Sequence, residues 1–233
     1  MEITVIASGS SGNAYRISDG TTALLLDAGI PIKEIHKALN FRVHDLAGCL
    51  ITHEHGDHVK AASDLAKAGI NIYASPGTIQ AAGLSGHRIK AVQALKEFRI
   101  GSFAILPFDV QHDAKEPLGY LITSAATGEK LLYFTDSFYL KYRFDGLTHI
   151  MGECNYAVDI VENNIRNGLI PAELAVRLMK SHLSLEHFLG FLRSNDLRQI
   201  KQIYLLHLSD NNSDAERFKR EVQRMTGVEV YVG

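Results

Sequence analysis

The sequence has little cysteine, no tryptophan and no strong excess of either charge. Its two cysteines, Cys49 and Cys154, form no CxxC pair, which excludes a disulfide scaffold or a cysteine-based zinc finger. No apolar run approaches the ~18 residues that cross a bilayer. No basic segment precedes an apolar stretch at the N-terminus, so we expect no secretion signal, no membrane partner and a cytoplasmic location. The net charge of −2 excludes a strongly basic, non-specific nucleic-acid binder but leaves room for a local basic groove.

The 233 residues have a globular composition, with 46% hydrophobic and 21% charged residues. No repeat or long linker interrupts the chain, which favours a single domain over residues 1–233. Runs that are apolar throughout, such as 23–26 and 131–134, are typical of strands covered on both faces. Helices are expected at 31–39, 58–68, 173–180, 184–195 and 212–226. This pattern predicts a layered α/β protein with its sheets between helices.

Histidine is abundant, with eleven residues, and three of them lie in the run HEHGDH at 53–58. Three imidazoles and a carboxylate so close together are costly to bury unless they coordinate something. His53 and His55, two positions apart at a strand end, point the same way, while Asp57 and His58 lie on the turn into a helix. The arrangement suits two adjacent metal sites, with zinc the first choice and manganese or iron the competitors.

Further ligands are expected where other apolar runs end. Two neighbouring metal ions need more ligands than the 53–58 turn provides, including a bridging carboxylate. The candidates are His112, Asp136 and His207. Any one of them alone would more often be an ordinary hydrogen-bonded residue, but with the turn they complete a set for two metals.

The order of these residues resembles that of the metallo-β-lactamase-fold hydrolases, over essentially the whole chain. The resemblance implies an αββα four-layer sandwich that holds two divalent ions, Zn²⁺ or Mn²⁺, in a cleft at one edge. It implies a first metal on His53, His55 and His112, a second on Asp57, His58 and His207, and Asp136 as the bridge. Asp27 matches an aspartate that supports the metal-binding loop without binding metal. A histidine at position 55, where the family's di-iron redox branch has glutamate, favours hydrolysis.

Four other segments resemble the small single-domain YycJ/WalJ/VicX group, relatives of DNA- and RNA-processing enzymes. The segments are 8–13, 153–155, 181–184 and 207–212. This resemblance implies a phosphodiesterase that uses metal-activated hydroxide, and within that class a DNA exonuclease of 5′→3′ polarity, with DNA favoured over RNA. One departure is Tyr156, where we expect histidine in the group.

Two residues are predicted to take part in catalysis. Asp57 is expected to orient the hydroxide or take its proton. His182 resembles a histidine of the tRNA 3′-processing endonuclease that stabilises the phosphate transition state or protonates the leaving oxygen. The alternative for this segment is a helix cap through Ser181 or Ser184, with His182 incidental.

Substrate contacts are predicted in two places. The loop after the first strand could expose backbone N–H groups to a phosphate, and its candidate residues are Ser10, Ser11, Gly12 and Asn13. A tight hairpin turn is an equally good interpretation of this loop. Arg177, a few residues before His182, is a candidate phosphate contact, although a solvated surface position is its alternative.

Two other functions are compatible with a dinuclear site. The first is a di-zinc hydrolase of a small substrate, such as a thioester, a lactone or a cyclic phosphodiester, because the metal ligands alone do not select the substrate. The second is a non-catalytic metal-binding scaffold, against which the complete ligand set argues.

Overall fold

The computed structural model describes residues 1–233. Contacts between residues divide the chain into two compact units. The first unit contains Met1–Asp109 and Ala114–Glu129, and the second contains Val110–Asp113 and Lys130–Gly233. The segment Val110–Asp113 therefore belongs to the second unit although the chain on both sides of it belongs to the first. No helix combines the length and apolar character that crossing a membrane requires.

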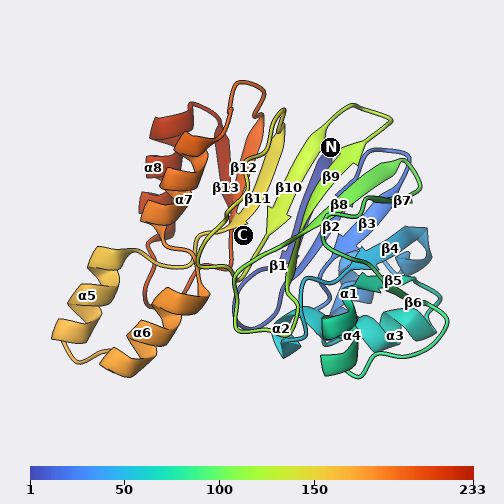
Figure 1. The fold of residues 1–233 in the computed structure, drawn as a ribbon, viewed down its shortest axis with the longest axis horizontal. Coiled ribbons are helices and arrows are strands. Elements are labelled where there is room, and N and C mark those ends of the chain that lie inside the picture. Colours follow the sequence, from blue (N-terminus) through green and yellow to red (C-terminus); the bar gives the residue numbers. More distant parts are fainter. The chain divides into compact units, whose positions relative to one another are not determined.

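The largest sheet of the first unit has six strands in the order β1-β2-β3-β4-β5-β6. They are β1 Glu2–Ala7, β2 Ala14–Ser18, β3 Ala23–Leu26, β4 Leu46–Leu50, β5 Ile72–Ala74 and β6 Ile89–Ala91. β1, β2 and β3 are antiparallel neighbours, and β3 to β6 run parallel. The helices between the parallel strands are α1 Ile32–Ala38, α2 Gly56–Val59, α3 Ala62–Lys67 and α4 Pro76–Ala81, with a 3₁₀ turn at Val43–Asp45. In Figure 1, α1, α3 and α4 lie beside the parallel strands.

The core of the first unit explains its continuous apolar runs. β3 is buried at every position, as expected of a strand covered on both faces. Leu25 and Cys49 from the sheet belong to one hydrophobic cluster with Ile35 from α1 and Leu65 from α3. Cys49 is a free thiol in this core. The strand predicted at 23–26 is confirmed.

The first unit also contains an antiparallel group of strands, β7 Phe98–Ile100, β8 Phe103–Asp109 and β9 Leu118–Ser124. β8 and β9 pair over seven positions, from Phe103 opposite Ser124 to Asp109 opposite Leu118. Antiparallel neighbours need only a loop between them, and no helix lies between β8 and β9.

The second unit contains four parallel strands in the order β13-β12-β11-β10. They are β10 Lys130–Phe134, β11 His149–Glu153, β12 Gln202–Leu206 and β13 Glu229–Val232. Its helices are α5 Val158–Arg166, α6 Ala172–Ser181, α7 Leu185–Ser194 and α8 Ala215–Thr226. Figure 1 shows α7 and α8 beside the strands, and α5 and α6 as a separate pair. That pair has a small core of its own, centred on Tyr156, Val161 and Ala175.

The helix predicted at 58–68 is interrupted. The structure has α2 and then α3, because the N–H of Ala61 donates to the carbonyl of Ala28 (2.8 Å) instead of to a helical partner. The helix predicted at 212–226 begins later, at Ala215, since the side chain of Asp214 caps it by accepting from the Arg217 N–H. α4 and α5 were not among the predicted helices. The remaining predicted helices lie within one or two residues of the observed ones.

Candidate metal centre

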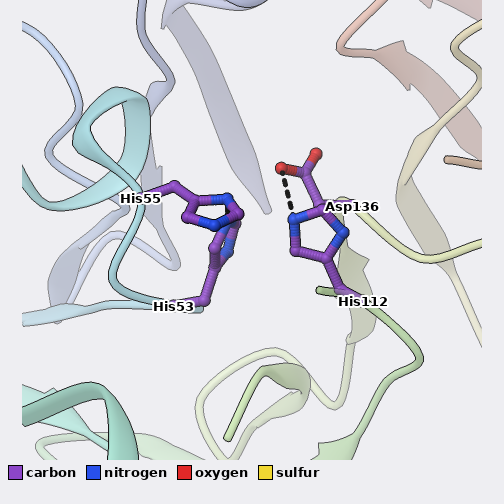
Figure 2. A group of neighbouring side chains, drawn as sticks. All are labelled: His53, His55, His112 and Asp136. Atoms are coloured by element: carbon purple, nitrogen blue, oxygen red, sulfur yellow. Dashed lines mark hydrogen bonds and ion pairs between the residues drawn. The ribbon is translucent and has the colours of Figure 1, made fainter. Parts of the chain in front are cut away.

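The histidine-rich run lies between the end of β4 and the first turn of α2. The carbonyl of His55 accepts hydrogen bonds from the N–H groups of His58 and Val59 (2.9 and 3.0 Å), which closes the turn. As a result, the ring centroids of His53 and His55 lie 4.6 Å apart and those of His53 and His58 lie 4.2 Å apart. Figure 2 shows the imidazoles of His53 and His55 side by side. Glu54 points elsewhere and accepts from the Lys115 N–H (2.6 Å).

Asp27 holds this turn from the end of β3. Its buried carboxylate accepts from the backbone N–H and the hydroxyl of Thr52, at 2.8 and 3.0 Å, and from Nδ1 of His58 at 2.8 Å. A hydrogen bond at Nδ1 fixes the ring tautomer and leaves Nε2 free of a proton, the form that binds a metal. These are the contacts that a supporting, non-ligating aspartate requires.

Asn13 makes a second connection to the turn, and it lies inside the protein. Its backbone N–H donates to the carbonyl of Asp57 (2.8 Å), and its side-chain nitrogen lies 3.1 Å from Nε2 of His58. The same amide closes the loop after β1, because it donates to the carbonyl of Gly9 and accepts from the Gly9 N–H, both at 3.0 Å. Asn13 therefore contacts the ligand turn directly, a position that its residue type alone did not indicate.

The other predicted phosphate-binding residues of this loop differ in exposure. Gly12 is buried, and a Cβ atom at its position would lie 2.6 Å from the carbonyl oxygen of Gly29. Its N–H donates to the carbonyl of Gly9 (3.0 Å), as in a tight turn. Of the four predicted residues, only Ser10 and Ser11 are exposed. These two are therefore the ones that a phosphate can reach from solvent.

The second unit carries its own cluster at the carboxyl ends of three parallel strands. Asp136 follows β10, Glu153 ends β11 and His207 follows β12. Parallel strands deliver their carboxyl ends to one edge of a sheet, and here the ligand atoms of Asp136, Glu153, His182 and His207 lie within 4.8 Å of one another. Asp136 and His207 adopt left-handed backbone angles, with φ of 48° and 53°, a conformation that non-glycine residues tend to keep at functional sites.

His112 joins this cluster from the segment Val110–Asp113. Its Nε2 lies 3.6 Å from a carboxylate oxygen of Asp136, the contact drawn as a dashed line in Figure 2. Its Nδ1 donates to the carbonyl of Ser181 (3.0 Å). Burial lowers the pKa of His112 in spite of the neighbouring carboxylates, which favours the neutral imidazole that metals bind.

Glu153 is a buried acid to which the sequence analysis assigned no role. It accepts from Nδ1 of His182 (2.6 Å) and from the N–H groups of Ser137 (2.9 Å) and Leu183 (3.2 Å). Burial alone would raise the pKa of Glu153, but the charge and hydrogen bond of His182 outweigh it and lower the pKa. For His182, burial alone would lower the pKa, but the charge and hydrogen bond of Glu153 outweigh burial and raise the pKa. An acid that ends an apolar run, as Asp136 does, was the available clue.

The remaining predicted residues lie at the edge of this cluster. Ser184 caps α7 by accepting from the His187 N–H, so the helix cap and the separate contact of His182 with Glu153 are both present. Arg177 on α6 is exposed and pairs with Asp113 (3.2 Å), next to His112 in the chain. Tyr156, which replaces the expected histidine, is buried.

The sequence is similar to a known protein family and to two named bacterial proteins. A model for the beta-lactamase superfamily domain matches residues 22–207. The chain belongs to the β-lactamase superfamily. Exodeoxyribonuclease YycJ of Bacillus anthracis is 28% identical, over 97% of this chain and 89% of that protein. Exodeoxyribonuclease WalJ of Streptococcus pneumoniae serotype 2 is 32% identical, over 91% of this chain and 83% of that protein.

Solved structures show the same fold. The metallo-β-lactamase-fold protein YhfI from Bacillus subtilis superposes with a TM-score of 0.75 at 17% identity, over 99% of this chain and 95% of that one. Human tRNase Z, short form, superposes with a TM-score of 0.65 at 15% identity, over all of this chain and 96% of that one. This superfamily member therefore has the metallo-β-lactamase fold, and the predicted fold class is confirmed.

Proposed function

We propose that this superfamily member is a dinuclear-metal phosphodiesterase that degrades DNA as an exonuclease. The observation that carries the proposal is the pair of imidazole–carboxylate clusters at strand ends, in a chain about 30% identical to two exodeoxyribonucleases. We further propose that residues 1–233 act as one domain, because the superfamily model, at 22–207, includes both clusters.

The side chains present fit two divalent ions. The first unit offers three imidazoles and a carboxylate, and the second offers two imidazoles and a carboxylate. Nδ1 of His58 is bonded to Asp27 and Nδ1 of His112 to the Ser181 carbonyl, so Nε2 of each ring is the atom oriented for a metal. We propose His53, His55 and His112 for one ion, Asp57, His58 and His207 for the other, and Asp136 between them. Nitrogen and carboxylate donors suit Zn²⁺ or Mn²⁺.

The reaction would need the metals and two side chains. When bound, the ions would lower the pKa of a water molecule so that it attacks phosphorus near neutral pH. Asp57, whose side chain is about one quarter exposed, would orient that water and take its proton. His182 keeps Nδ1 on Glu153, which leaves Nε2 to donate to the phosphate or to the leaving oxygen. Because Glu153 raises the pKa of His182, the imidazole would be ready to donate a proton.

Incubation with labelled nucleic acids tests the proposal. Single- and double-stranded DNA and RNA, labelled at either end, would be incubated with pure protein and Mn²⁺ or Zn²⁺, alongside a bis-aryl phosphodiester. Shortening of DNA from its 5′ end supports the exonuclease of 5′→3′ polarity, and faster loss of RNA would overturn the preference for DNA. Hydrolysis of the small ester or of a thioester alone would support the small-substrate hydrolase, and no turnover would support the scaffold.

A further inference from the structure

An exposed aromatic side chain stands beside the C-terminal end of α1 in the first unit. Phe41 is 73% exposed, the second most exposed large hydrophobic side chain of the molecule. Its backbone has a φ of 60°, and the preceding Asn40 has a φ of 50°. A bulky residue in the left-handed region is a conformational outlier. The hydrogen bond from the Phe41 N–H to the carbonyl of His36 (2.7 Å) fixes this conformation and turns the ring outward.

The groove beside this ring is lined by apolar and basic side chains alone. Its volume is about 380 Å³, and its lining consists of Ile32, Lys33, His36, Lys37 and Phe41. The rings of His36 and Phe41 meet edge to face at 6.4 Å. Lys33 and Lys37 are exposed, and no acidic side chain pairs with either of them. Glu34, the acid of the same helix, is exposed but does not line the groove.

An exposed ring beside unpaired cations is the combination that binds a single nucleic-acid strand. A base stacks on the aromatic face without regard to sequence, and the cations contact the phosphates that flank it. A protein partner with an apolar surface would leave two lysines unpaired in its interface, which is unfavourable because lysine is depleted at interfaces. Charge complementarity therefore favours nucleic acid over a protein surface.

The groove also belongs to the unit that carries the ligand turn, and a short hydrogen-bonded segment links the start of α1 to that turn. α1 begins three positions after Gly29, whose N–H donates to the carbonyl of Asn13 (2.8 Å), and Asn13 in turn donates to Asp57. A seven-residue helix is about 10 Å long, the length of about three stacked nucleotides. The helix is therefore long enough for a few nucleotides to lie along it.

We propose that the α1 groove, formed by Ile32, Lys33, His36, Lys37 and Phe41, is a binding site for single-stranded DNA outside the metal centre. A base stacks on Phe41 and two phosphates contact Lys33 and Lys37. The proposal rests on the proposed function for its choice of DNA as the natural ligand. In that case the groove binds the DNA strand before it is cleaved.

Fluorescence anisotropy with a labelled oligothymidine of about 20 nucleotides tests the stacking contact. Binding is measured in chelator, so that no cleavage takes place. Phe41→Ala and Phe41→Leu should each weaken binding about tenfold, whereas Phe41→Trp should preserve it, because only the flat ring stacks on a base. Leu95→Ala is the matched control, since Leu95 is also exposed (61%) and left-handed (φ 63°) but lies outside the groove. Equal binding by Phe41→Ala and wild type would overturn the proposal.

The dependence of binding on salt tests the two lysines. Replacing Lys33 and Lys37 together by glutamine should reduce the slope of log K against log salt by about 1.4, because each single-strand phosphate contact contributes about 0.7. The control is the same change at Lys90 and Lys96, which are exposed elsewhere in the first unit. An unchanged slope in the Lys33 and Lys37 variant overturns the proposal. The proposal is also overturned if Phe41→Leu binds oligothymidine like wild type. Leucine is apolar but cannot stack on a base, so such a result would show a merely apolar surface that suits a protein partner.

A small substrate separates this proposal from the proposed function. All groove variants should hydrolyse a bis-aryl phosphodiester at the wild-type rate, since that ester needs only the metal centre. One outcome is that wild type cleaves neither the ester nor DNA while Phe41→Ala still weakens oligothymidine binding. That result would overturn the nuclease function and support the groove as a binding site. If wild type cleaves DNA and the groove variants bind and cleave normally, the groove fails and the nuclease function stands.

Discussion

The proposed metal ligands of the first unit are neighbours in the chain, whereas those of the second unit are distant and meet only after folding. In the first unit, His53 to His58 depend on residues outside the run, namely Asp27 and Asn13. In the second unit, the ligand Asp136 contacts His112 and His207 directly. Residues outside each set also hold it, because Asp27 and Asn13 contact the first set while the Ser181 carbonyl and Glu153 contact His112 and His207 in the second. Only the second set joins its own members across distant segments, and four substitutions test the roles proposed for residues in the two units.

The largest effect is expected for Asp57→Ala. Loss of the carboxylate removes both a proposed ligand and the proposed proton acceptor, so turnover of a bis-aryl phosphodiester should fall by about 10⁴-fold. The Asp57 side chain is partly exposed and lies outside the hydrophobic core, so the circular dichroism spectrum should stay unchanged. Asp64→Ala, at an exposed aspartate of α3, is the control and should retain full activity. Wild-type rates for Asp57→Ala would contradict the proposed mechanism.

His182→Ala should lower kcat by about 10²- to 10⁴-fold while both metals are retained, because we propose His182 as a proton donor rather than a ligand. Metal content by mass spectrometry separates this outcome from loss of a metal. His187→Ala, at an exposed histidine of α7, should have no effect. Loss of metal from His182→Ala would instead show that the histidine belongs to the coordinating set.

Asp27→Asn should weaken metal binding about 10- to 100-fold, because the amide no longer fixes the His58 tautomer. Competition with a chromophoric chelator measures the affinity. Asp19→Asn is the matched control, since Asp19 is also a carboxylate held by hydroxyl and backbone donors in the first unit, but it contacts no imidazole. Equal metal affinity in the Asp27→Asn variant and wild type would show that the ligand turn holds itself.

Asp19→Asn itself should have the smallest effect, on stability alone. Burial raises the pKa of Asp19, but hydrogen bonds from Ser102, Ser124 and the 21–22 backbone outweigh it and lower the pKa from 3.8 to about 2. A lowered pKa stabilises the fold above pH 3.8 and loses this effect as the pH falls through about 2. We expect Tm to fall by about 2–4 °C at neutral pH and the difference to vanish near pH 2. A constant difference down to that pH would contradict the assignment.

Much of the ligand set could be predicted because it lies where strands end. The run at 53–58 is conspicuous in the sequence, and His112, Asp136 and His207 each follow an apolar segment. The tautomer-fixing contacts could not be predicted in the same way, because the bond from His112 to the Ser181 carbonyl joins positions 69 residues apart. The break between α2 and α3 was missed for a similar reason, since Ala61 donates to Ala28 across the loop.

Glu153 and Asn13 show where residue type misled the prediction. A buried glutamate is costly unless it is fully bonded, and its partners come from two separate segments, one at Ser137 and the other at His182 and Leu183. Asn13 stands in a loop rich in glycine and serine, which predicts exposure, yet its amide is enclosed and bonded on both sides. Both residues acquire their environment from tertiary contacts.

The placement of Val110–Asp113 in the second unit has a consequence for synthesis on the ribosome. His112 contacts Asp136 and Ser181, and both of these residues are translated after the whole first unit. At 5–20 residues per second, the last hundred or so residues take roughly 5–20 s to appear. During that interval the nascent chain already carries its histidine-rich turn but lacks His207 and the strands that hold it. A polypeptide released early therefore has five of the seven proposed ligands but lacks Asp136 and His207.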